Sequence, residues 1–146
     1  MNFLKCTCAD SWADEAKLIL RVVLGVIFLY HGYAKFGMGT EAIAGFFGAV
    51  GIPMAGFFAP LVIWVEMIGG VALILGVLTH WVSKLFVIIS LVALFMVHIK
   101  NGFSIAQNGY EFILLILAAS VTTMIMGAGK YSVDAMIGKS ENTTNA

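Results

Sequence analysis

The stretch AKLILRVVLGVIFLYHGYAKFG, from Ala16 to Gly37, decides the fold and contains the first candidate functional residues. Its apolar part is almost uninterrupted from Val22 to Tyr30, and a helix of this length crosses the roughly 30 Å of hydrocarbon in a bilayer. His31 and Lys35 follow four residues apart, so a helix presents both side chains on one face. The stretch therefore predicts a membrane-spanning helix with ionisable groups near one end.

The composition of the whole chain agrees with a membrane location. The 146 residues are 61% hydrophobic and 11% charged, whereas soluble domains are roughly 45–50% apolar and about 25% charged. Other apolar runs of about 20 residues follow the first one, without the alternation over ~10 residues that marks a transmembrane barrel strand. We therefore expect an all-α, polytopic membrane protein whose main partner is the lipid bilayer. The formal net charge of zero argues against nucleic-acid binding.

We predict three parts along the chain. A cytoplasmic leader covers residues 1–16, a four-helix membrane domain covers 17–129, and a cytoplasmic tail covers 130–146. The expected spans are about 17–36, 60–78, 81–99 and 110–126, the second opened by Pro60, with Thr79 and His80 as the turn into the third and Gly127 as the helix stop.

The segment 37–59 is apolar enough to suggest a fifth span, but its composition argues against one. It is rich in glycine, and Pro53 interrupts any helix near the middle of the segment. We expect a broken helix that lies at the membrane interface or re-enters the membrane between the first two spans. Near the start of the first span, Lys17 and Arg21 are expected to extend toward the lipid headgroups. Gly25 is expected to let another helix approach closely.

The distribution of lysine and arginine predicts the orientation. With four spans, one side of the membrane holds both termini and the turn between the second and third spans, and the opposite side has few basic residues. The positive-inside rule then puts both termini in the cytoplasm. The basic residues on the terminal side are Lys5, Lys17, Arg21, Lys84, Lys130 and Lys139, and those on the opposite side are Lys35 and Lys100.

This topology collects ionisable residues in the outer half of the bundle. Such groups cost about 2.5–3.5 kcal/mol each at the centre of a membrane helix, so they usually face the bundle interior or pair with one another. We expect Glu66 and Lys35 to form an ion pair that leaves His31 free to exchange protons. The candidates for proton handling are His31 and Glu66, and the candidates for ligand contact are Lys35, His98, Glu111 and Trp64.

Each candidate also has a structural interpretation. The Glu66 group can be a buried pair that only holds the helices together, while His98, Lys100 and Glu111 can be ordinary interfacial residues. Trp64 fits an aromatic belt at the membrane surface, as do Trp81 and Tyr110.

Three kinds of ligand site were compared. A quinone pocket needs an aromatic-rimmed cavity and a His or Glu to exchange protons, and this chain has both residue types. A metal site is not predicted, because the two histidines and two glutamates come from four segments without a short ligand spacing. A proton-linked transporter fits less well, because no polar residues continue the path into the cytoplasmic half. Cys6 and Cys8 in the leader are either free thiols or sites of acylation, metal binding between copies or disulfide exchange.

Short motifs follow one another along the chain: Tyr30-His31-Gly32 with Lys35-Phe36, Phe46-Phe47 with Gly51-Ile52-Pro53, Glu66 with Gly69-Gly70, Leu75-Gly76-Val77-Leu78-Thr79, and Gly127 to Asp134. In the order and spacing of these motifs the chain resembles the DoxX family of small four-helix bacterial membrane proteins. The resemblance covers about Leu18 to Asp134. It implies a multi-pass protein of the bacterial inner membrane, related to the DoxD subunit of thiosulfate:quinone oxidoreductase and to proteins of thiol and oxidative-stress defence. It also places His31, Lys35 and Glu66 on the polar positions of the family.

Two functional hypotheses follow. In the first, the chain is a membrane subunit of a redox system that binds a quinone or a small oxidant on the outer side and works with a redox partner protein. In the second, it is a non-catalytic scaffold or partner-binding bundle in which the same residues only hold the helices in register. Small residues on the second span, Gly69, Gly70, Ala72 and Gly76, are candidates for a homo-oligomer contact.

Overall fold

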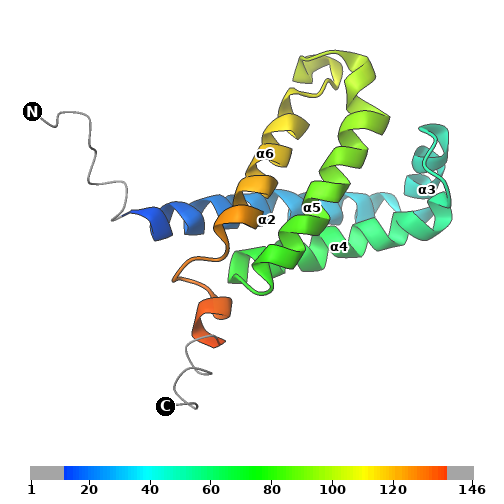
Figure 1. Ribbon diagram of the computed structural model, residues 1–146. Helices are drawn as coiled ribbons and strands as arrows, with labels where there is room; N and C mark the ends of the chain where they lie inside the picture. Colours follow the sequence, from blue (N-terminus) through cyan, green and yellow to red (C-terminus); the bar gives the residue numbers. More distant parts are fainter. Residues whose placement is uncertain (1–11, 138–146) are drawn as a thin grey trace, which may run out of the picture.

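The computed structural model describes residues 12–137, which form helices and loops without a strand among them. Two antiparallel helical hairpins make up the fold (Figure 1). The first pairs α2 (Ala13–Met38) with α4 (Ala55–Leu75), and the second pairs α5 (Thr79–Ala93) with α6 (Glu111–Met126). Cys6, Cys8, most of the predicted leader and the end of the tail lie outside the described residues.

Short helices complete the end of the bundle opposite the chain termini. Between α2 and α4 lies α3 (Thr40–Ala49), and α5 continues through a π-helical turn, η1 (Leu94–His98), and a 3-10 turn, η2 (Ile99–Asn101). A second 3-10 turn, η3 (Ile105–Gln107), lies in the loop before α6. Figure 1 shows this end of the α5/α6 hairpin rising away from α2 and α4.

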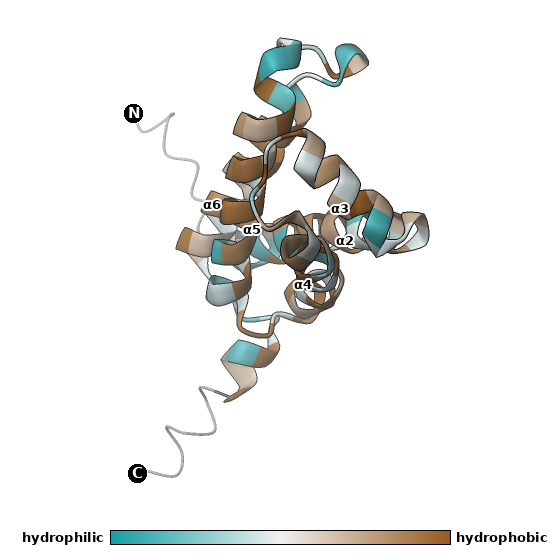
Figure 2. Ribbon diagram, turned by 90° about the vertical axis from the view of Figure 1, so that its right-hand side faces the viewer, coloured by the Kyte–Doolittle hydropathy of each residue, from teal (hydrophilic) through white to brown (hydrophobic). Residues whose placement is uncertain are grey.

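Three of the helices are long and apolar enough to cross a membrane: Ala13–Met38, Ala55–Leu75 and the continuous Thr79–Asn101. Hydrophobic residues predominate along the hairpins, and hydrophilic residues gather at the loop of the α5/α6 hairpin (Figure 2). The all-helical membrane class is thereby confirmed. Helix α6 is apolar but has only 16 residues, a length of about 24 Å.

Some predicted boundaries were wrong. Helix α4 begins at Ala55, so Pro60 lies inside it, where its missing N–H removes only one backbone hydrogen bond. The same helix ends at Leu75 because Gly76 adopts a left-handed conformation, with φ of 73°. Thr79 and His80 are the first residues of α5 rather than a turn.

Other local predictions were right. The segment 37–59 is broken as expected, since α3 is only ten residues long and Pro53 lies between α3 and α4. Gly127 ends α6 with φ of 69°.

Arg21 was predicted wrongly. Its side chain is fully buried instead of extending to headgroups. The guanidinium donates hydrogen bonds to the carbonyl oxygens of Leu73 and Ile74 at 2.7 and 3.0 Å, and to that of Tyr131 at 2.7 Å. The last carbonyls of a helix have no partners within it, and they also carry the negative end of the helix dipole. Arg21 therefore joins α2, the end of α4 and the segment after α6.

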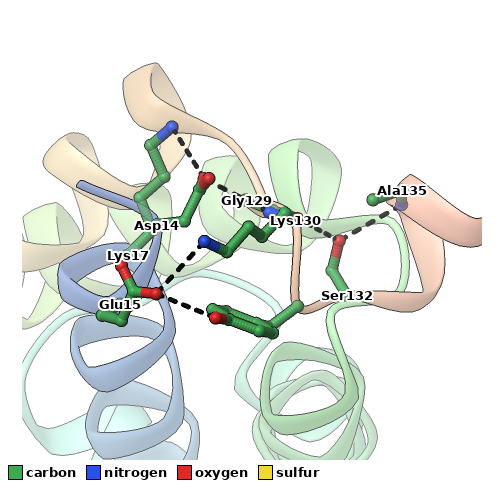
Figure 3. Close-up of polar contacts among 8 residues, drawn as sticks. Asp14, Glu15, Lys17, Gly129, Lys130, Ser132 and Ala135 are labelled. Carbon is green, nitrogen blue, oxygen red and sulfur yellow. Dashed lines mark hydrogen bonds and ion pairs between the residues drawn. The ribbon is translucent and has the colours of Figure 1, made fainter. Parts of the chain in front are cut away.

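The segment 127–137 closes this end of the bundle, which we call the Arg21 end. The carboxylate of Asp134 accepts hydrogen bonds from the backbone N–H groups of Leu78 and Thr79 at 2.8 and 3.0 Å, which caps the start of α5. The hydroxyl of Ser132 donates to the carbonyl of Gly129 at 2.6 Å and accepts from the N–H of Ala135 (Figure 3). The Gly127–Asp134 motif is thus a clamp: it caps the start of α5 directly, and through Arg21 it is joined to the end of α4.

Side-chain contacts to α2 hold the same segment. Glu15 pairs with Lys130 at 3.2 Å and accepts a hydrogen bond from the Tyr131 hydroxyl at 2.8 Å (Figure 3). The Glu15 carboxylate holds the pKa of Lys130 above its usual value. Asp14 accepts a hydrogen bond from the backbone N–H of Lys130 at 3.3 Å.

Glycines set the separation of α2 and α4. A Cβ added at Gly70 would lie 2.7 Å from the carbonyl oxygen of Gly25 and 2.7 Å from the backbone N of Leu29. The close approach expected at Gly25 is therefore present. Gly69 packs against Phe86 and Gly76 against Arg21, so these glycines, proposed above for contact between copies, are used within the chain.

We expect Gly70→Ala to lower the free energy of unfolding by about 1–3 kcal/mol, because the new methyl group meets backbone atoms that cannot move aside. Gly45→Ala is the matched control, since nothing lies within 4 Å of its added Cβ. Thermal or denaturant unfolding of the purified protein in detergent measures the difference. Equal stability of Gly70→Ala and Gly45→Ala would contradict the close contact.

Candidate functional site

A cavity of about 900 Å³ lies between the two hairpins, toward the end opposite Arg21. We call it the inter-hairpin cavity. Its walls come from α2, α3 with the loop after it, α4, α5 with η1, η3 with the loop after it, and α6, and most of its side chains are apolar. The rings of Phe28 and Phe86 stack at 3.6 Å between centroids and join the hairpins at the cavity wall. The polar lining residues are His31, Lys35, Glu66, Ser90, His98 and Asn108.

Glu66 and Lys35 form the expected ion pair. The Lys35 ammonium lies 2.6 and 2.5 Å from the two carboxylate oxygens of Glu66, which is only 2% exposed. The pair joins α2 to α4, where Gly32 makes room for it: an added Cβ there would lie 3.0 Å from the Cβ of Glu66. Charges held together in this way form a dipole with no net charge on a mostly apolar wall.

His31 lies one turn before Lys35 on α2 and lines the same cavity. Its ring centroid is 6.3 Å from that of Phe112 on α6, so it faces across from one hairpin toward the other. No residue within 12–137 makes a hydrogen bond to the His31 ring, and the side chain is exposed. The imidazole is therefore available to a ligand in the cavity.

His98 reaches the cavity from η1. Its Nδ1 lies 2.9 Å from the backbone carbonyl oxygen of Asn108. Asn101 donates to the same carbonyl at 3.1 Å and to that of Val97 at 3.3 Å. These bonds tie the loop before α6 to the end of α5 and fix the position of the imidazole.

The remaining predicted site residues lie elsewhere. Trp64 lines a separate apolar groove, is 51% exposed and packs edge-on against Phe36. It lies two residues from Glu66, which puts the two side chains on nearly opposite faces of α4. Glu111 begins α6 and does not line the inter-hairpin cavity, and neither does Lys100. The described residues contain no group of three or more His, Cys, Asp or Glu placed to hold a metal ion.

Ser90 was missed by the sequence analysis. It is fully buried and lines the cavity, and no group in the described part of the chain makes a hydrogen bond to its hydroxyl. The only available signal was the seven-residue spacing of Ser83 and Ser90 in an apolar helix, which puts both on one face. Small polar residues at that spacing are equally typical of helix packing in membranes.

Comparison with known proteins agrees with this architecture. A DoxX family model matches residues 16–99, more than half of the chain. The chain belongs to the DoxX family. The match includes α2, α3, α4 and α5, and with them the residues His31, Lys35, Glu66 and His98.

Two relatives match along most of their length. CatD of Bacillus subtilis, which carries the provisional name of an oxidoreductase, is 34% identical over 128 residues, covering 88% of this chain and 91% of CatD. YqjF of Escherichia coli, named as an inner membrane protein, is 30% identical over 128 residues, covering 86% of this chain and 95% of YqjF. No solved structure is significantly similar to the chain.

Proposed function

We propose that this DoxX protein is a membrane subunit of a redox system and binds a quinone, or a similar lipid-soluble oxidant, in the inter-hairpin cavity. The observation that carries the proposal is the combination of a large apolar cavity with only a few polar groups on its wall. Pockets for small molecules are typically 300–1,000 Å³, mostly apolar, with a few polar groups that orient the ligand. The oxidoreductase name of CatD supports the same class of chemistry.

The polar groups suit a ligand that takes up or loses protons with its electrons. His31 and Glu66 are the proposed proton-handling residues, and Lys35 neutralises the Glu66 carboxylate. His98 contributes a further ligand contact from η1. Phe28, Phe112 and the other apolar lining residues provide surfaces on which a ring can pack.

The proposed setting is the bacterial inner membrane, with four spans and both termini in the cytoplasm. Helix α6 is then the fourth span, and α3 lies at the interface or re-enters the membrane. Residues 1–16 and 130–146 flank the membrane domain 17–129. Lys17 lies near the start of α2, Lys84 near the start of α5 and Lys130 in the segment after α6, all toward the Arg21 end, which supports its cytoplasmic placement. The cavity then faces the outer half of the bundle, and electrons pass to or from a redox partner protein.

Mass spectrometry of lipid-soluble ligands retained after gentle solubilisation tests the proposal. We expect quinone in the wild-type protein and a loss of at least tenfold in Glu66→Gln and His31→Ala with helicity unchanged, because each variant removes a polar contact within the cavity. Glu111→Gln is the matched control, since it neutralises an acid outside the cavity. Wild-type protein that carries no quinone and binds none when quinone is added would refute the proposal.

The second candidate is a non-catalytic scaffold. The observation that favours it is that the Lys35–Glu66 pair connects two helices and so contributes to the fold without any ligand. Under this alternative the variants melt earlier while no ligand is lost from any of them. Ligand content and melting temperature, measured on the same preparations, separate the two functions.

A further inference from the structure

The contacts of His98 determine which of its nitrogens carries hydrogen. A backbone carbonyl oxygen can only accept a hydrogen bond, so the Nδ1 of His98, 2.9 Å from the Asn108 carbonyl, must be the donor. In the neutral imidazole this leaves Nε2 with a lone pair and no hydrogen. No residue within 12–137 makes a hydrogen bond to Nε2. The cavity therefore has an unoccupied acceptor on its α5 side.

The π-helical turn brings His98 to the cavity. The N–H of Ile99 bonds to the carbonyl of Leu94, five residues back, where an α-helix would bond four residues back. Ala93 and His98, also five residues apart, both line the cavity. In a regular α-helix, five residues turn through about 500°, which would put these side chains roughly 140° apart. The wider turn instead places the imidazole on the cavity face.

The opposite side of the cavity, formed by α2 and α4, offers a hydrogen-bond donor instead of an acceptor. The Lys35 ammonium has three N–H donors and no acceptor. Both carboxylate oxygens of Glu66 already accept hydrogen bonds from this ammonium. A ligand that reaches both sides can form hydrogen bonds with both groups. One of its oxygens accepts from the Lys35 ammonium, and one of its hydroxyls donates to Nε2 of His98. The two carbonyl oxygens of a quinone only accept, whereas a reduced quinone carries phenolic hydroxyls that donate.

We propose that His98 makes the inter-hairpin cavity selective for the reduced, phenolic form of its ligand, through a hydrogen bond from a ligand hydroxyl to Nε2. This inference rests on the proposed function, because it names the redox form that the proposed quinone site binds more tightly. Preferential binding of the reduced form favours reduction of the bound ligand, and for a two-electron couple each tenfold preference corresponds to about 30 mV.

Equilibrium binding of one short-chain benzoquinone and of its hydroquinone, kept anaerobic, to the full-length protein in nanodiscs tests the inference. We expect His98→Ala to weaken hydroquinone binding about tenfold, the effect of one lost hydrogen bond, and to change quinone binding less than twofold. His98→Gln, whose amide oxygen also accepts, is expected to restore part of the preference. His80→Ala is the matched control, because Nδ1 of His80 also bonds a backbone carbonyl, that of Met124, at the Arg21 end.

The outcomes separate the two proposals. If the wild-type protein binds neither form, the proposed function fails and the inference fails with it. If both forms bind but His98→Ala weakens them equally, or changes neither, the inference is overturned while the quinone site stands. A misfolded His98→Ala protein leaves His98→Gln to decide: that variant supports the inference only if it binds hydroquinone more tightly than quinone.

Discussion

Replacing Glu66 with leucine is expected to lower the free energy of unfolding by about 3 kcal/mol, because it strands the Lys35 ammonium in the cavity wall without a counter-charge. Glu66 is 2% exposed, and the carboxylate binds the ammonium with both oxygens. Removing one partner of a buried pair is far more costly than removing both, since the remaining charge has lost its solvation. The double variant Lys35→Met/Glu66→Leu should therefore recover most of the lost stability.

Unfolding of the wild type, both single variants and the double variant in the same detergent gives the coupling energy between the two residues. Glu111→Leu is the control for loss of an acid at the same end of the bundle, and it should change stability by less than about 0.5 kcal/mol. If the double variant is as unstable as Glu66→Leu, the pair is not the source of the effect. A stable double variant that also lacks quinone would show that the pair serves the ligand beyond its part in the fold.

The second large effect is expected at Arg21. Arg21→Met removes three hydrogen bonds from a charged, fully buried group. The carbonyls of Ile74 and Tyr131 lose the donor that Arg21 supplies, while that of Leu73 keeps the backbone N–H of Gly76 at 3.1 Å. Hydrogen bonds to charged groups contribute about 1.5–3 kcal/mol each and are not additive, so we expect a loss of at least about 3 kcal/mol. Arg21→Lys keeps the charge but not the planar fork that reaches three carbonyls, so its stability should be intermediate.

Lys17→Met is the control, because Lys17 lies one turn earlier on α2 and, among residues 12–137, forms an ion pair only with Asp14, at 3.5 Å. It should be nearly neutral. Trypsin provides a local readout, since Lys130 lies in the clamp that Arg21 holds: cleavage after Lys130 should be faster in Arg21→Met than in Lys17→Met. Similar cleavage and melting of these two proteins would mean that the clamp does not depend on Arg21.

Part of the candidate site could be predicted from the sequence. Ionisable residues in apolar runs are rare and must pair or face the interior, so His31, Lys35 and Glu66 could be recognised one by one. The four-residue spacing of His31 and Lys35 put them on one face of a helix. The ion pair with Glu66 required only that the first two long helices be antiparallel neighbours, and long helices that follow one another in the sequence usually lie side by side.

The differences between these expectations and the structure have a common cause. Arg21 was expected at the headgroups because basic residues at helix starts usually extend there, but the end of α4 and Tyr131 supply acceptors that the sequence does not reveal. Trp64 and Glu111 were grouped with the site by their depth in the membrane, whereas the cavity depends on helix rotation. The glycines at positions 69, 70 and 76 were candidates for contact between copies, but they pack within the chain, and a small residue in the sequence does not reveal whether its neighbour is another chain or another helix.

The sequence by itself determined the all-helical membrane class, the break around Pro53 and the helix stop at Gly127, because hydrophobic run length and backbone stereochemistry are local properties. Only the tertiary structure decided where the polar residues lie and what they contact. The separation of the two hairpins creates the cavity, the π-helical turn rotates His98 into it, and the clamp buries Arg21. Each of these depends on the relative rotation and distance of helices, which are set by contacts between residues far apart in the chain.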